Sequence, residues 1–271
     1  MIERVERAEA QRLAAYRGTF AVTEPERNVG DEVPAGWEGV LFPFAVPVTD
    51  LRPDGTPARD GVIPEIDLPR RMYAGEDTTF HAPVRIGDEV TQRTTLGAVT
   101  EKNGASGRLV FVDVEREYTI GGDARVRSVW HDVFLEAADP DAPPREPRRA
   151  RDAVAEADWV ERMTLDARQL FRFSALTFNT HLIHYDRQWA QREEGLPDLL
   201  VHGPLTRILL MDAARRRRPE ARARSLSVRM VAPSLVDREM RMAGRDDGDR
   251  TIVTALDPDD AVLATAEVGW A

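Results

Sequence analysis

Three long segments of alternating hydrophobicity, joined by short turns, constrain the fold of this chain more than any other feature. They are EVTQRTTLGAVT (89–100), LVFVDVEREYTI (109–120) and ARVRSVWHDVFLE (124–136). Apolar and polar residues alternate along them, as in strands that bury one face. The turns between them, KNGASG (102–107) and GGD (121–123), contain the Gly and Asn residues that are typical of tight hairpins. The sequence therefore predicts an antiparallel meander of three strands.

The second half of the chain predicts a similar set of strands with a long helix in front of them. The segment 204–217, PLTRILLMDAARRR, has the apolar spacing of a helix, with proline near its start and Gly203 at the cap. Helical spacing at 167–178 and a strand candidate at 159–165 precede it. Four more strand candidates follow, at 225–231, 239–245, 251–257 and 261–270. This order fits an antiparallel sheet wrapped around a buried helix, the hot-dog arrangement.

A stretch rich in proline and charge separates the two halves. Residues 137–151, AADPDAPPREPRRAR, have no apolar periodicity and indicate a linker. We therefore expect an α+β double hot-dog, with antiparallel sheets each wrapped around a central helix. The expected domains are an N-terminal hot-dog with a degenerate helix at 1–140, a linker at 141–154, and a C-terminal hot-dog at 155–271.

The N-terminal half has a less regular pattern than the C-terminal half. Its first element is expected to be a helix at about residues 3–17, because charged and apolar residues are spaced there as on an amphipathic helix. Prolines and glycines interrupt the segment from Gly30 to Asp67, which has no clear assignment. Within it, GWEGVLFPFAV (36–46) is apolar enough to form either a buried helix or a buried strand.

The composition excludes several classes of function. The 271 residues contain no cysteine, which excludes a disulfide framework, a cysteine-ligated iron–sulfur site and a thiol nucleophile. A formal net charge of −10 argues against a general nucleic-acid binder, which would need a basic field. No apolar run approaches the roughly 18 residues of a membrane span, and the charged N-terminus lacks the apolar core of a signal peptide. We therefore expect a cytoplasmic protein that binds neither nucleic acid nor membrane.

The residues that suggest chemistry lie before the long helix and at its start. The stretch TFNTHLIHYD (177–186) contains Asn179, His181 and His184, and His202 and Gly203 follow. A helix N-terminus offers unpaired N–H groups and a positive dipole end, which suit a carbonyl oxygen that gains negative charge. Gly203 lets such an oxygen approach the backbone, and a histidine can move a proton at neutral pH. This set suits the addition of water to a double bond conjugated with a thioester, or the reverse reaction.

Other interpretations of the same residues stay open. An H-x-x-H pair with Asp186 could bind a metal, although no H-E-x-x-H or comparable signature is present. A Ser/His/Asp triad has no G-x-S-x-G elbow to support it. His184 and His202 could be core residues, and Asn179 could cap or bridge a turn. The favoured interpretation of Asp186 is the N-cap of the helical stretch DRQWAQREEG.

Arginines supply the candidate groups for substrate binding. Arg70 and Arg71, with Tyr73, could line an acyl pocket and hold a substrate carboxylate. The run 215–218 is four arginines and could bind phosphates, but arginines in a last helical turn also meet the dipole and solvent, which is the favoured interpretation. The remaining histidines, His81 and His131, are expected in or near strands without a chemical role.

Two stretches around these histidines resemble a known enzyme family. FRFSALTFNTHLIHYDRQWA (171–190), followed by LVHGPLTRILL (200–210), resembles the MaoC-like (R)-specific enoyl-thioester hydratases. The likeness is strongest to the hydroxyacyl-thioester dehydratase type 2 branch, which includes the bacterial mesaconyl-C4-CoA (3-methylfumaryl-CoA) hydratases. LPRRMYAGEDTTFHAPVRIGDEVTQRTTL (68–96) and GRLVFVDVEREY (107–118) resemble the same branch, so the likeness covers roughly residues 35–271.

The resemblance implies roles for individual residues. The C-terminal hot-dog would carry the catalytic residues, and the N-terminal one would help to bind the acyl chain. The usual motif has an aspartate five residues before its catalytic histidine; His184 matches the histidine and Asn179 replaces the aspartate. Because asparagine has no useful basicity, His184 is assigned as the base or acid that activates water, and Asn179 as the group that orients the water or the imidazole. The Gly203 N–H would bind the thioester oxygen, and His181, at the position of the motif's asparagine, is not expected to be catalytic.

The resulting functional hypothesis is a hydro-lyase that adds or removes water across the C2–C3 double bond of an acyl-CoA thioester. The best substrate is a branched short-chain enoyl-CoA such as mesaconyl-C4-CoA. Neither a metal nor a redox cofactor is expected, coenzyme A is part of the substrate, and a homodimer is one expected assembly. The alternatives are a 3-hydroxyacyl dehydratase that acts on acyl carrier protein thioesters, and a non-catalytic hot-dog that binds acyl thioesters.

Overall fold

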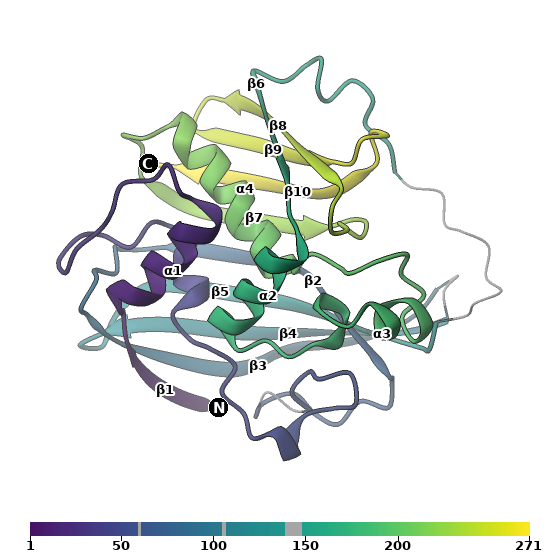
Figure 1. Ribbon diagram of the computed structural model, residues 1–271. Coiled ribbons are helices and arrows are strands. Elements are labelled where there is room, and N and C mark those ends of the chain that lie inside the picture. The colour runs from purple at the N-terminus through teal and green to yellow at the C-terminus, as the bar shows by residue number, and fades with distance from the viewer. Residues whose placement is uncertain (59–60, 105–106, 139–147) are drawn as a thin grey trace.

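The computed structural model describes residues 1–58, 61–104, 107–138 and 148–271. Within these residues, ten strands form one antiparallel sheet in the order β1-β3-β4-β5-β2-β7-β10-β9-β8-β6 (Figure 1). The strands are β1 (Ile2–Arg7), β2 (Arg70–Phe80), β3 (Glu89–Gly104), β4 (Gly107–Ile120), β5 (Asp123–Leu135), β6 (Trp159–Thr164), β7 (Ala223–Met230), β8 (Glu239–Asp247), β9 (Arg250–Leu256) and β10 (Val262–Trp270).

The strand order contains an internal repeat. The N-terminal half runs β1-β3-β4-β5-β2, and the C-terminal half, taken from its outer edge, runs β6-β8-β9-β10-β7. Each strand of the first half therefore has a counterpart five strands later. β2 and β7 are antiparallel neighbours and join the halves edge to edge, with Gly75 opposite Arg229 and Thr79 opposite Ser225. The predicted α+β double hot-dog is confirmed, with its two sheets fused into one.

The two halves differ in the helices that precede their second strands. The helices are α1 (Ala10–Phe20), α2 (Ala167–Thr177), α3 (Arg187–Arg192) and α4 (Gly203–Arg217), with short 3-10 helices η1 (Trp37–Val40), η2 (Val48–Asp50) and η3 (Leu182–His184). α4 is buried from Leu205 to Ala214 and packs on β2 and on the strands of the C-terminal half (Figure 1). Among the described residues no helix of this length precedes β2, where the chain forms α1, η1 and η2 instead.

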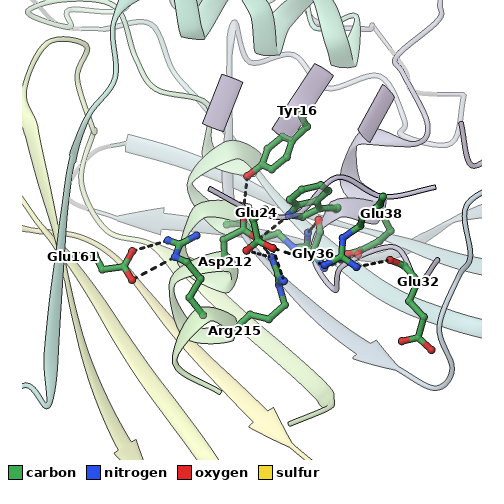
Figure 2. A network of polar contacts seen from close by, with 12 residues as sticks. Tyr16, Glu24, Glu32, Gly36, Glu38, Glu161, Asp212 and Arg215 are labelled. Atoms are coloured by element: carbon green, nitrogen blue, oxygen red, sulfur yellow. Dashed lines mark hydrogen bonds and ion pairs between the residues drawn. The ribbon is translucent and has the colours of Figure 1, made fainter. Parts of the chain in front are cut away.

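A buried carboxylate on α4 ties this helix to the N-terminal half. Asp212 accepts hydrogen bonds from Tyr16 Oη of α1 (3.0 Å) and Trp37 Nε1 of η1 (2.8 Å), as Figure 2 shows for Tyr16. Arg215, one turn later, contacts Asp212 (2.9 Å) and Glu24 (2.9 Å). Because an unpaired buried charge is costly, these partners fix α4 against the segment before β2.

A buried cation on the same helix makes the second connection between the halves. Arg207 is 2% exposed and forms ion pairs with Glu38 of η1 (2.7 Å) and Glu76 of β2 (3.3 Å). It also donates a hydrogen bond to Thr78 Oγ1 (2.9 Å). The neighbouring carboxylates hold the pKa of Arg207 above its ordinary value despite burial, which on its own would lower it. The central helix is therefore oriented by charge as well as by apolar packing.

The expected first helix is wrong over its first half. Residues Ile2–Arg7 form strand β1 on the edge of β3, and α1 begins only at Ala10. The spacing of Ile2 and Val5 matches a helical face, but backbone pairing with β3 determines the structure. The apolar segment 36–46 contains the short helix η1 rather than a longer helix or strand. Strand β2, in the middle of the sheet, was not predicted.

The described part of the expected linker contacts the C-terminal half. Arg149 forms an isolated antiparallel bridge with Ala261. Ala150, Ala153 and Val154 pack against a small apolar cluster that includes Leu256. Residues 139–147 of the expected linker lie outside the described residues. No helix within the described ranges is long and apolar enough to cross a membrane.

Candidate active site

A cavity of about 400 Å³ lies between the two halves, beside the N-terminal end of α4. Its wall combines residues from β2 and β5 of the N-terminal half with residues from η3, α4 and the β7–β8 connection of the C-terminal half. Most of the lining is apolar, and Asn179, His181, His184 and Gly203 are all among the lining residues. Such an apolar cavity with a few convergent polar groups is the usual form of a small-ligand site. Four of the residues singled out from the sequence therefore line one cavity.

His184 lies at the end of η3 and is 5% exposed. Its Nδ1 lies 2.8 Å from the main-chain oxygen of Leu200, which fixes the hydrogen on Nδ1 and leaves the lone pair on Nε2. Within the described residues Nε2 has no hydrogen-bond partner, and the ring lines the cavity. Burial, followed by the nearby His181, lowers the pKa of His184 to about 3. The imidazole is thus neutral at pH 7 and can accept a proton.

His202 supports His184 from behind. The two rings stack at 3.6 Å between centroids with an interplanar angle of 20°. His202 is fully buried, and its Nε2 lies 2.9 Å from Ser174 Oγ of α2. Its pKa is well below the ordinary value because of burial and then because of the neighbouring histidines. His202 is not among the residues that line the cavity, so the structure places it behind the candidate base rather than against a ligand.

Asn179 follows the C-terminal end of α2, where Phe178 takes a left-handed conformation at φ 53°. The Asn179 side chain lines the cavity, and its Oδ1 accepts a hydrogen bond from the main-chain N–H of His181 (3.0 Å). Its Nδ2 makes no hydrogen bond within the described part of the chain and can donate to a ligand. The amide therefore has one side that holds the local backbone and one side that faces the cavity.

Gly203 is the first residue of α4, and its N–H has no backbone acceptor among the described residues. The residue also packs tightly, because a Cβ at this position would lie 2.3 Å from Tyr73 Cδ1. Tyr73, on β2, lines the cavity, donates a hydrogen bond to Glu76 (3.3 Å) and meets Trp130 edge-on at 4.6 Å. Glycine is needed here because an aromatic ring of the other half lies directly against the helix start. The free N–H and the dipole make this end suitable for a partly negative oxygen.

Arg70 and Arg71 both line the cavity, as expected, but each already faces a carboxylate of the protein. Arg70 Nε lies 2.6 Å from Glu194, and Arg71 Nη2 lies 2.6 Å from Asp132. Both carboxylates are buried, at 4% and 3% exposed. The two arginines therefore shape a polar wall whose charges are balanced.

The other residues considered from the sequence lie away from the cavity. Asp186 caps α3, with its side chain accepting from Trp189 N (3.0 Å), as the favoured interpretation predicted. The arginines 215–218 lie at the opposite end of α4 from Gly203, and each contacts a carboxylate of the protein. His131 contacts Asp113 and Asp77 on the strands β4 and β2, and His81 is exposed after β2. No group of three His, Asp or Glu suited to a metal occurs in the described ranges.

The residues that position the candidate base were not predicted from the sequence. Ser174 and Leu200 hold His202 and His184, but neither carries a signal by itself, since serine and leucine are ordinary in helices and loops. Trp130 and Asp132 are two residues apart on β5 and both line the cavity. The period of two along a strand could have identified them as residues of one face. Glu194 could have been found only by its pairing with Arg70 in three dimensions.

The arrangement as a whole supports one kind of chemistry. A neutral imidazole with a free Nε2 and an unpaired N–H at a helix start line the same small apolar cavity. The first can take a proton from water, and the second can bind an oxygen that gains negative charge when an adjacent double bond is attacked. The addition of water to a conjugated carbonyl compound, and the reverse reaction, require these two groups.

Comparison with solved structures shows the same fold in several proteins. HtdX from Mycobacterium tuberculosis superposes with a TM-score of 0.72 at 16% identity, covering 99% of each chain. A MaoC-like dehydratase from Phytophthora capsici gives 0.70 at 14% identity, covering 100% of this chain and 95% of the other. A further Mycobacterium tuberculosis protein, described as having a double hot-dog fold, gives 0.56 at 15% identity over 98% and 93%. At these identities the likeness concerns the fold.

Comparison of sequences is more specific. The chain is 38% identical to the mesaconyl-C(4)-CoA hydratase of Chloroflexus aurantiacus over 266 residues, 95% of this chain and 92% of that protein. It is 29% identical over 111 residues to the mitochondrial hydroxyacyl-thioester dehydratase type 2 of Schizosaccharomyces pombe, 39% of this chain and 36% of that protein. The family model of hydroxyacyl-thioester dehydratase type 2 matches residues 36–236, which include every cavity-lining residue except Leu263. The chain belongs to the hydroxyacyl-thioester dehydratase type 2 family.

Proposed function

We propose that this protein is an enoyl-thioester hydratase/dehydratase whose substrate is mesaconyl-C4-CoA or a closely related short, branched enoyl-CoA. The observation that carries the proposal is the neutral, buried His184, whose free Nε2 shares a cavity with the unpaired N–H of Gly203. Identity of 38% over nearly the whole of a mesaconyl-C(4)-CoA hydratase supports the substrate class. The cavity of about 400 Å³ suits a small acyl group.

In this proposal each residue of the cavity has a defined role. His184 Nε2 accepts a proton from water as the oxygen bonds to C3 of the acyl group. The electrons of the double bond move toward the thioester oxygen, which the Gly203 N–H binds. His184 then returns the proton to C2, and Asn179 Nδ2 donates to the water. His202 holds the plane of the His184 ring through the stack and its contact with Ser174.

The remaining features of the proposal concern the acyl group and the assembly. The charges of Arg70 and Arg71 are already balanced by Glu194 and Asp132. The proposal of a dicarboxylic substrate is therefore based on the similarity to the mesaconyl-C(4)-CoA hydratase and not on these arginines. They and Tyr73 form the wall against which the acyl group packs. The N-terminal half (1–140) would supply this wall and the C-terminal half (155–271) the proton transfer. A cytoplasmic location and a homodimer are further parts of the proposal.

Incubation of the purified protein with mesaconyl-C4-CoA tests the central claim. We expect the ultraviolet absorbance of the conjugated thioester to fall and the product mass to rise by one water. His184→Ala should lower kcat by about 10²–10⁴-fold, the usual contribution of a general base. His81→Ala, which changes an exposed histidine that is not among the lining residues, is the matched control and should keep full activity. Full activity of His184→Ala would contradict the proposed site.

A second candidate function is favoured by the family name and by the Schizosaccharomyces pombe relative, which is a hydroxyacyl-thioester dehydratase. In this case the substrate would be a 3-hydroxyacyl group on an acyl carrier protein. To distinguish the two candidate functions, kcat/KM is measured for the same acyl group attached to coenzyme A and to a carrier protein. The preferred carrier gives the higher kcat/KM. Binding of both without any loss of conjugated absorbance would instead indicate a non-catalytic protein.

A further inference from the structure

His181 is a second histidine in the wall of the same cavity. It is 6% exposed, lines the cavity with His184 and Asn179, and meets His184 edge-on, with ring centroids 5.5 Å apart and an interplanar angle of 83°. The two rings therefore border one small volume from two directions. The sequence position alone gave no reason to expect His181 to be catalytic.

Neither ring nitrogen of His181 has a partner in the described part of the protein. Nε2 is closed off from solvent and makes no hydrogen bond. Nδ1 makes none either, and it is not fully enclosed, in a residue that lines the cavity. Buried polar groups in proteins are nearly always paired, and an apolar ring of similar size would fill this space without an unpaired nitrogen. The imidazole therefore lacks a purely structural explanation.

Two hydrogen bonds hold the backbone at and just before His181. Its N–H donates to Asn179 Oδ1 (3.0 Å), and the preceding residue, Thr180, donates from Oγ1 to the main-chain oxygen of Gly55 (2.7 Å). The carbonyl side of the Asn179 amide is thus used to fix His181. The residue that replaces the usual aspartate supports a ring that could itself contact the reacting atoms.

The His181 ring is neutral at pH 7. Burial lowers its pKa to about 3, and Arg71 and Arg52 add to this effect. A neutral imidazole carries one N–H and one lone pair, so Nδ1 can hydrogen-bond an oxygen as donor or acceptor according to the tautomer. Rings 5.5 Å apart can both reach a single water at ordinary hydrogen-bond distances.

We propose that His181 is a second catalytic residue, whose Nδ1 hydrogen-bonds the oxygen that adds to or leaves C3 of the acyl thioester. This inference rests on the proposed hydratase function. In hydration, one proton of the water passes to His184 Nε2 as the C3–O bond forms, and the same proton then bonds to C2 as the thioester carbonyl is restored. The second hydrogen stays on the oxygen, which becomes the product hydroxyl beside His181. No proton is gained or lost, and His181 fixes the direction of the attacking lone pair.

Three substitutions at position 181 test the proposal with mesaconyl-C4-CoA and with a monocarboxylic enoyl-CoA. His181→Phe keeps the ring volume and removes the nitrogens. His181→Asn places an amide near Nδ1, and His181→Gln places it near Nε2. We expect kcat to fall about 10²-fold in His181→Phe with KM changed less than threefold, and thermal stability unchanged or higher. His181→Asn should stay within about tenfold of the original protein and exceed His181→Gln.

The outcomes separate this inference from the proposed function. If the original protein hydrates no enoyl thioester, the proposed function fails first. If it is active and His181→Phe is folded and within threefold of it, the role of His181 is overturned. Should His181→Phe not fold, the other two variants decide, because Asn above Gln supports a contact through Nδ1 and equal activity of the two contradicts it.

Discussion

At the scale of single residues, burial in the candidate site keeps neutral the histidine side chains that would be partly charged in water. His184 would carry a charge over part of the physiological range if it were exposed, because an ordinary histidine has a pKa near 6.5. In its buried position, with Nδ1 held by Leu200 and the ring stacked on His202, it stays neutral. The fold thereby gives the proposed base a defined lone pair but not strong basicity.

The low pKa of His184 predicts an unusual dependence of activity on pH. Protonation removes the lone pair, so kcat/KM should fall only as pH approaches the acidic value of about 3, and not near 6.5. We therefore expect a flat profile of kcat/KM from about pH 8 to pH 5, measured with a short enoyl-CoA. Circular dichroism at each pH identifies any loss caused by unfolding. A fall in activity of the folded protein centred near pH 6.5 would show that the base is not desolvated as described.

At the scale of elements, the start of α4 is the feature on which the site most depends. This helix presents its free N–H groups to the cavity only because Gly203 allows Tyr73 of β2 to pack against it. The element is thus placed by a contact between the two halves, and the same contact forms part of the cavity wall. Any side chain at position 203 must displace either the ring or the helix.

Gly203→Ala should therefore lower both stability and activity. The added Cβ would lie 2.3 Å from Tyr73 Cδ1, which forces a shift of the helix start. Overpacking of this kind typically costs about 1–3 kcal/mol, and we expect kcat/KM to fall at least tenfold as the N–H moves. Tyr73→Ala removes the ring, so Gly203→Ala should cost much less free energy of unfolding in that background than in the original protein. Urea titration of the four proteins measures the two costs, and an equal cost in both backgrounds would contradict the packing argument.

The elements also show what the sequence could and could not reveal. The expected helix at 204–217 and the strands of both meanders agree with the structure to within a few residues, because their apolar periodicity is strong. β2 was missed because Glu76 and Asp77 interrupt its apolar pattern. Their charges are balanced by Arg207 and Arg229, which lie far along the chain and cannot be paired with them from sequence.

The site shows the same division. Gly203 and His184 could be located from a helix start and a histidine motif, since both signals are local in sequence. The unpaired nitrogens of His181 and the support of His202 by Ser174, 28 residues away, depend on the folded arrangement. Sequence patterns therefore found Gly203 and His184, to which we assign the chemistry, more readily than the residues that position them.

At the scale of the whole molecule, the two halves share one sheet and one cavity. β2 and β7 pair directly, and across this junction Asp77 contacts Arg229 (2.6 Å) and Ser227 (2.6 Å). The cavity draws Tyr73 from one half and His184 from the other. The repeat in strand order is thus a feature of architecture, and neither half lines the whole cavity.

This dependence predicts the behaviour of the halves as separate chains. Alone, residues 155–271 would leave Arg207 without Glu38 and Glu76, and would expose the β7 edge that β2 covers. An unpaired buried charge costs about 3–5 kcal/mol, a large part of the roughly 5–15 kcal/mol that stabilises a typical domain. We expect this half to give no native circular dichroism and no hydration. When residues 155–271 are co-expressed with residues 1–140, the two chains should co-purify on size exclusion and retain turnover, because each half then supplies the partners that the other lacks. A folded, active 155–271 fragment would show instead that the shared sheet and the charge pairs on α4 are dispensable.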